Sequence, residues 1–153
     1  AEILVDMAAQ SEASLHRWIE GGDVLGLASE LDSEVFFWHV MDDGKDSVAL
    51  LKRLFERYGD AGRYVIVLNY GRGSDFSMFK KSDVYRQVQR LNIPVVELRA
   101  LHGPTMLRID RFDKSFWGAV NNNDTDDSLG LMERQRVKVW TRQAFGAFER
   151  LGL

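Results

Sequence analysis

The chain opens with the stretch AEILVDMAAQ, residues 1–10, and the expected fold is built outward from it. Ile3, Leu4 and Val5 form a continuous apolar run, which is typical of a parallel strand covered on both faces. Asp6 then stands at the expected carboxyl end of this strand, where open α/β sheets bind their ligands. An aspartate that only caps the following turn would have the same surroundings in the sequence. The stretch therefore predicts a buried strand, and it leaves two roles open for Asp6.

Apolar segments and helical patterns alternate along the rest of the chain. We expect strands at residues 2–6, 34–40, 63–69 and 93–98. Helical spacing of apolar residues predicts helices at 11–20, 48–58, 83–91 and 129–151. Such alternation implies right-handed parallel crossovers, and so a three-layer α/β fold with a mostly parallel sheet and helices on both faces. Pro94 cannot donate a ladder hydrogen bond, which places the last strand at an edge of the sheet.

Length and composition limit the classes of protein that need to be considered. At 153 residues we expect one domain, residues 1–153, with a polar linker at 121–128 before the closing helix. The chain has no Cys, which excludes disulfides and thiolate metal sites and fits a cytoplasmic protein. Its net charge of −3 does not support nucleic-acid binding by bulk charge, so DNA is expected only indirectly or through a local patch. No apolar run approaches the roughly 20 residues of a membrane span.

Three of the predicted strands end in polar residues or polar loops. These are Asp6, the loop MDDGK at residues 41–45, and Asn69. The carboxyl ends of parallel strands meet at one edge of a sheet, so we expect these groups to lie together. An Asn side chain both donates and accepts hydrogen bonds and can read a nucleobase edge, or it can simply close a strand through a local backbone bond. The two aspartates of the MDDGK loop are expected to be solvated loop charges.

Other short motifs fall short of a recognised site. The segment GKDS at 44–47 lacks the earlier glycine and the Lys-Ser/Thr pair of a phosphate loop, so Lys45 is expected to start a helix. The segment GRG at 71–73 does not complete G-x-G-x-x-G, although Arg72 could reach a phosphate. The three histidines are scattered without metal-ligand spacing, and His39 lies inside a strand pattern, which favours a structural role.

The segments ILVDMAAQ (3–10), VIVLN (65–69) and VVEL (95–98) together resemble the later half of a ParA/MinD-type P-loop ATPase. Within that group, the chain is most similar to the plasmid-stability and conjugal-transfer branch of StbB-like and TraL-like proteins. The resemblance covers roughly residues 1–120. It implies a cytoplasmic ATPase that uses ATP and Mg²⁺, works with a protein partner and can form a homodimer.

The resemblance also implies roles for individual residues. The strand-end aspartate of the Walker B element, which contacts Mg²⁺ through water, corresponds to Asp6. The asparagine that contacts adenine corresponds to Asn69. The loop that lines the base pocket corresponds to residues 99–103, which contain Arg99, Leu101 and His102.

Two departures from the family pattern bear on activity. The family's phosphate loop is absent from this sequence, so we expect a carboxyl-terminal portion of a larger ATPase that binds no nucleotide tightly alone. In such sheets the phosphate-loop strand lies between the Walker B strand and the next one, so its loss should leave an empty slot or make residues 3–5 pair elsewhere, for example with another copy. The family's D-x-P-x-G is here DMAAQ, which echoes D-x-A-G-Q of Ras-like GTPases. Gln10 is therefore a candidate to orient the attacking water, and a Gln that caps the next helix is the alternative.

A second function is compatible with the same sequence. The chain could be a non-enzymatic α/β protein-interaction module with a flavodoxin-like outline. Its partner would then bind aromatic-rich segments that contain Phe76, Phe79, Phe112, Phe116 and Trp117.

Overall fold

The computed structural model of the protein describes residues 3–8, 10–122 and 127–153. Half of the predicted polar linker at 121–128, residues 123–126, lies outside these ranges. The elements are α1 (Glu12–Gly21), α2 (Val24–Glu30), β1 (Phe36–Met41), α3 (Lys45–Tyr58), the 3-10 turn η1 (Gly59–Ala61), β2 (Arg63–Asn69), α4 (Ser77–Lys80), α5 (Asp83–Arg90), β3 (Val95–Leu98), α6 (Gly103–Arg111), α7 (Phe116–Asn121) and α8 (Leu131–Glu149). No helix within the described ranges is long and apolar enough to cross a membrane.

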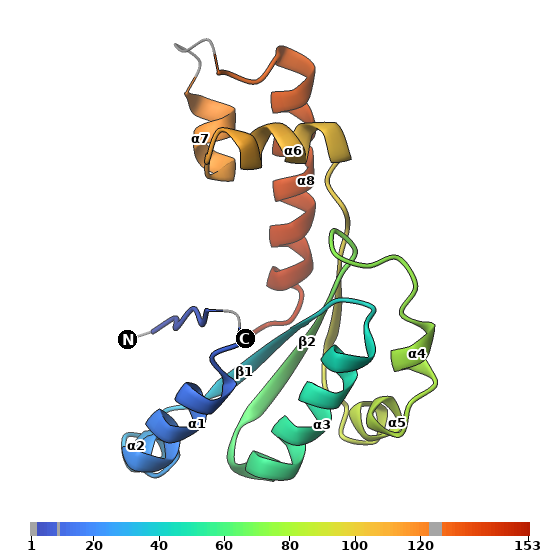
Figure 1. Cartoon of the computed structure of the whole chain (residues 1–153). Helices are drawn as coiled ribbons and strands as arrows, with labels where there is room; N and C mark the ends of the chain where they lie inside the picture. Colours follow the sequence, from blue (N-terminus) through green and yellow to red (C-terminus); the bar gives the residue numbers. More distant parts are fainter. Residues whose placement is uncertain (1–2, 9, 123–126) are drawn as a thin grey trace.

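The sheet has three parallel strands in the order β1-β2-β3 (Figure 1). The α/β class and the parallel sheet are therefore confirmed, and the strands predicted at 34–40, 63–69 and 93–98 are present with small shifts of their bounds. Helix α3 connects β1 to β2, as a parallel pair requires. The strand that contains Val95 lies at an edge, as Pro94 predicted.

The strand predicted at residues 2–6 is wrong for the part that the structure describes. Residues 3–8 have no regular secondary structure, and Leu4 is 89% exposed. An apolar run becomes a buried strand only where another strand offers its edge and a helix covers its face, because tertiary packing and not local preference stabilises strands. Within the described residues, no strand pairs with residues 3–8, so Asp6 does not mark the end of a strand.

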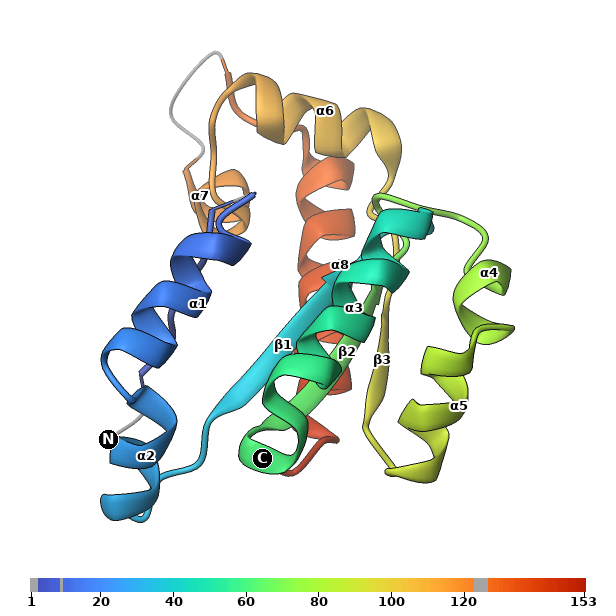
Figure 2. The ribbon, with the colours of Figure 1, turned by 60° about the horizontal axis from the view of Figure 1, so that its bottom comes forward.

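Strand β2 is the centre of the core because both of its faces are covered. Tyr64, Ile66 and Leu68 face a cluster that includes buried residues of α1, α3 and α5. Val65 and Val67 face the opposite side, where Ala147, Phe148 and Leu151 from the end of α8 pack against them. Figure 2 shows α3 in front of the sheet and α8 behind it. Five consecutive buried apolar residues are therefore accommodated only in the middle strand.

Helices α6 and α7 were not predicted from the sequence. Pro104 lies in the first turn of α6, where a missing N–H costs no helical hydrogen bond. The Ser115 hydroxyl caps α7 by accepting a hydrogen bond from the Gly118 N–H at 3.0 Å. The two helices share a small core with α8, built on Ile109, Ala119, Leu129 and Val137. The start of α6 is therefore marked by Pro104 and that of α7 by the Ser115 cap.

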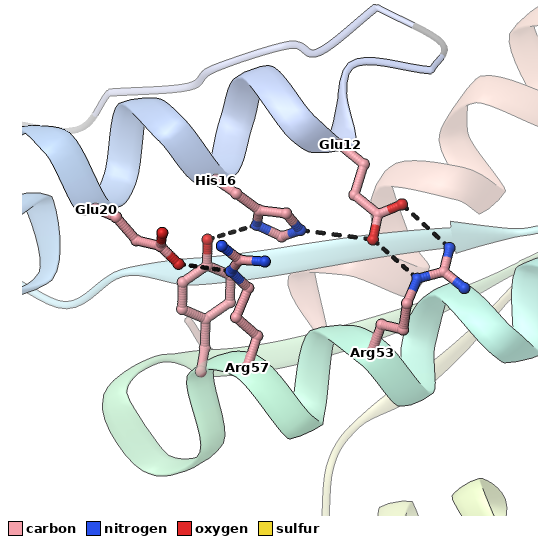
Figure 3. A network of polar contacts seen from close by, with 6 residues as sticks. Glu12, His16, Glu20, Arg53 and Arg57 are labelled. Carbon is pink, nitrogen blue, oxygen red and sulfur yellow. Dashed lines mark hydrogen bonds and ion pairs between the residues drawn. The ribbon is translucent and has the colours of Figure 1, made fainter.

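Ion pairs attach helix α1 to helix α3 (Figure 3). The Glu12 carboxylate accepts two hydrogen bonds from Arg53, each 3.1 Å long. Arg57 donates a 2.6 Å hydrogen bond to Glu20, the last residue but one of α1. The arginine hydrogen bonds lower the pKa of both glutamates. Exposed pairs of this kind contribute little to stability, so they fix the register of the two helices more than they hold them together.

Beneath these pairs lies the buried side chain of His16. Its Nδ1 atom is 2.6 Å from the Tyr58 hydroxyl, and its Nε2 atom is 3.5 Å from Glu12 (Figure 3). Both ring nitrogens of the buried imidazole thus have a polar partner, which removes the cost of an unsatisfied buried group. His16 is therefore a structural contact between the two helices.

Candidate functional site

The carboxyl edge of the sheet is the place where the three strand-end loops meet. Met41 pairs with Leu68 and Asn69 pairs with Leu98, so the strands end within about one residue of each other. The loops that follow are residues 42–44, 70–76 and 99–102. In open parallel sheets this edge is where ligands bind. It is therefore the candidate site, as the positions of the polar strand ends predicted.

Asn69 is the half-buried last residue of β2. Its side-chain oxygen accepts a 3.0 Å hydrogen bond from the Gly71 N–H, which is the local strand-closing bond that was one of the two alternatives. A Cβ added at Gly71 would lie 3.0 Å from that oxygen, so a side chain there would be crowded against the bond. The Asn69 NH₂ group has no partner among the described residues. The amide can therefore still donate to a ligand at this edge.

Asp43 joins the loop after β1 to the loop after β2. Its carboxylate accepts hydrogen bonds from the backbone N–H groups of Ser74 at 2.8 Å and Asp75 at 3.1 Å. These two bonds lower the pKa of the Asp43 carboxyl. Gly73 lies so close that an added Cβ would be 2.7 Å from the Asp43 backbone nitrogen. Asp43 thus organises the edge, a role that a solvated loop charge would not have.

Asp42 organises the start of helix α3. Its Oδ1 atom accepts hydrogen bonds from the Ser47 hydroxyl at 2.5 Å and from the Gly44 N–H at 2.9 Å. The Ser47 bond, followed by the Gly44 bond, lowers the pKa of the Asp42 carboxyl. Lys45 is the first residue of α3, which confirms its predicted place at a helix start.

His39 supports this edge from within β1. Its Nε2 atom lies 3.0 Å from the Ser47 carbonyl oxygen, so the neutral ring can donate a hydrogen bond to the first turn of α3. Burial lowers the pKa of His39, and the Ser47 hydrogen bond opposes this shift only in part. The structural role predicted for His39 is therefore supported by its geometry.

The depressed pKa of His39 predicts a dependence of stability on pH. The unfolded chain takes up a proton near pH 6.5, whereas the folded chain takes it up at a lower pH. The stabilisation is thus present above pH 6.5 and is lost as the pH falls through the folded pKa. We expect the thermal midpoint of unfolding to decrease as the pH is lowered from 7 to 5. The decrease should be smaller in His39→Gln. The control is His102→Gln, at an exposed position, which should show the same decrease as the wild type. An equal decrease of the thermal midpoint in the wild type and in His39→Gln would contradict the prediction.

The loop after β3 turns toward α6 and α8. The Arg99 side chain is exposed, and its carbonyl oxygen accepts a 2.6 Å hydrogen bond from the Trp140 indole N–H. Leu101 packs against the core of α6–α8. His102 lies beside the first turn of α6, where its Nδ1 atom is 3.0 Å from the Thr105 hydroxyl. The three predicted base-pocket residues therefore follow β3, and each of them contacts α8 or the core and first turn of the C-terminal helices.

Among the described residues, no hydrogen bond joins the two predicted catalytic residues to this edge. Asp6 is in the exposed segment 3–8, and Gln10 is exposed with a positive φ of 62°. Ser11 and not Gln10 occupies the N-cap position of α1. Within the described ranges, no hydrogen bond or ion pair links either side chain to Asn69. No group of three or more His, Cys, Asp or Glu side chains that could hold a metal ion is found among the described residues.

Two features of this region have little or no signal in the sequence. The contact between Asp43 and the Ser74 loop was signalled only by a glycine-rich loop after β2 and an aspartate after β1. The approach of Arg99 to α8 had no local signal, since Trp140 is 41 residues away in the sequence. Comparison with protein-family models, with curated proteins and with solved structures finds no match to this chain.

Proposed function

We propose that the chain is the part of a ParA/MinD-type ATPase that follows the phosphate loop, in a protein of plasmid stability or conjugal transfer. ATP and Mg²⁺ are then cofactors of the intact parent ATPase, and the chain alone does not hydrolyse ATP. Phosphate affinity in this fold comes largely from backbone N–H groups and a lysine of the phosphate loop. The described residues contribute the other wall of such a site, with Asn69 at its centre.

The observation that carries this proposal is the unpaired outer edge of β1. Among the described residues, Phe36–Met41 pair with β2 only. In the family, the phosphate-loop strand lies beside this edge and the Walker B strand lies beyond it. Residues 3–5 would then have no neighbouring strand until the phosphate-loop strand is in place, which accounts for their exposure. Trp38 and Val40 are exposed on the same strand, as expected of a surface that another segment of the intact parent ATPase would cover.

Titration calorimetry with Mg-ATP tests the proposal. The chain alone should bind no tighter than about 1 mM, on the order of 4 kcal/mol, because it lacks the phosphate loop. The same chain joined to an upstream segment with a G-K-G-G-x-x-K-[ST] motif should bind at about 1 μM, on the order of 8 kcal/mol. Micromolar binding by the chain alone, or no gain in the joined protein, would contradict the proposal.

An exposed apolar surface favours the second candidate, a protein-interaction module. Trp117 on α7 is 71% exposed and Leu131 on α8 is 74% exposed. Large exposed apolar side chains on adjacent helices are typical of a protein-binding face. The aromatic surface expected from the sequence is wrong at Phe76 and Phe79, which are buried in the main core. An interaction module should bind its partner equally with and without ATP, whereas the intact ATPase should not.

A further inference from the structure

A groove of about 300 Å³ runs between the end of β3 and helix α8. We call it the β3–α8 groove. It is lined by Arg99 from the strand end and by Trp140, Arg142, Gly146 and Arg150 from the helix, together with neighbouring residues. Of these lining residues, Arg99 was also predicted to line the base pocket of the ATPase, whereas the residues of α8 have no role in either candidate function.

Three guanidinium groups make the β3–α8 groove positive. Arg99, Arg142 and Arg150 have no ion-pair partner among the described residues. Glu97 is the acidic residue of the lining, but its carboxylate already lies 3.5 Å from Lys80 and accepts a 3.4 Å hydrogen bond from the Tyr70 hydroxyl. Positive charge thus gathers here on a chain whose net charge is −3. Guanidinium groups bind carboxylates or phosphates through paired hydrogen bonds, so the ligand should be anionic.

The walls of the groove are held in place by packing. The Trp140 indole donates to the Arg99 carbonyl oxygen at 2.6 Å, and its ring lies 4.7 Å from the Phe116 ring, centroid to centroid. Ala147 at the base packs against the β2–β3 core. A Cβ added at Gly146 would come no closer than 3.8 Å to Arg150, so the base is open to a ligand backbone. The groove is therefore a preformed feature.

The adjacent edge of β3 favours an extended peptide as the occupant. The Pro94 and Leu98 carbonyl oxygens accept hydrogen bonds of 2.9 Å from β2. Because backbone groups alternate in direction along a strand, Val95 and Glu97 turn their N–H and C=O groups outward. Within the described ranges β3 has no second neighbouring strand. An added strand could pair with these groups, as in other strand-addition complexes.

We propose that the β3–α8 groove binds an extended acidic peptide of a protein partner. The peptide main chain pairs with the outer edge of β3, and alternate carboxylates contact Arg99, Arg142 and Arg150. A nucleic acid fits less well, because a phosphate backbone gains nothing from the strand edge and approaches a protein of negative net charge. The proposal is independent of the ATPase assignment.

Fluorescence anisotropy with a labelled octapeptide of alternating Glu and Thr tests the proposal. Alternation places all four carboxylates on one face of the added strand. We expect saturable binding that Arg142→Glu and Arg150→Glu each weaken at least about tenfold, since each replaces an attractive contact by a repulsive one. Arg136→Glu on the same helix lies outside the groove lining and should change affinity less than about twofold. The thermal midpoint of each variant checks that it is folded.

Two further probes separate the occupants. An octapeptide that is N-methylated at alternate residues should bind at least about tenfold more weakly, because it loses the main-chain hydrogen bonds to β3. A short DNA duplex should bind no better to the wild type than to Arg142→Glu. Equal binding of both peptides, equal binding by wild type and Arg142→Glu, or tighter binding of DNA through the same arginines would overturn the proposal.

Discussion

Phe79→Ala is expected to lower the free energy of unfolding by about 3–5 kcal/mol, the range for deletion of a buried aromatic ring. Phe79 is 1% exposed on the short helix α4, and its ring lies 5.0 Å from the Tyr85 ring, centroid to centroid. The lost free energy has two parts: the ring no longer gains from its transfer out of water, and a cavity is left that the surrounding core cannot fill. Urea unfolding followed by circular dichroism measures it.

Met78→Ala is the matched control for this experiment. Met78 is the preceding residue on the same helix, but it is 52% exposed. Its replacement should change the free energy of unfolding by about 0.5 kcal/mol or less, as at other surface positions. Equal losses in the two variants would show that α4 does not pack on the core as described.

Asp6→Ala is expected to reduce ATP turnover at least about a hundredfold, or about 2.7 kcal/mol of barrier, in the chain joined to its phosphate loop. The expectation rests on the proposed Walker B role, in which the carboxylate acts on Mg²⁺ and not on the fold. Asp6 is exposed and lies outside every described helix and strand, so the thermal midpoint should stay unchanged. Turnover and midpoint are measured on the same protein.

Glu149→Ala controls for the loss of one exposed acid, and it should leave turnover unchanged. If Asp6 were only a cap, its replacement would instead cost about 1 kcal/mol of stability and leave hydrolysis intact. The structure weighs against a helix cap, since Ser11 stands at the N-cap of α1. A stable and fully active Asp6→Ala protein would remove the main residue on which the ATPase proposal rests.

Much of the parallel sheet could be predicted from the sequence. The predicted bounds of the central strand, residues 63–69, match β2, because an unbroken apolar run can be buried only where both faces of a sheet are covered. Asn69 follows this run directly, so its place at the carboxyl edge needed no tertiary information. Pro94 indicated the edge strand because it lacks the N–H that an inner strand would use. Leu51, Phe55 and Tyr58 recur at helical spacing, and all three are buried on α3.

Tertiary structure alone decided the rest. The sequence of residues 3–5 is as apolar as that of a strand, yet its burial depends on a neighbouring strand that the pattern itself cannot supply. The hydrogen bond from Ser74 to Asp43 spans 31 residues, and that from Trp140 to Arg99 spans 41. Such contacts depend on how the strands and helices pack, whereas the periodicity of a segment reports only which of its own faces is apolar. The sequence thus indicated the three strands of the sheet and the polar residues at their ends, and packing determined which polar side chains meet.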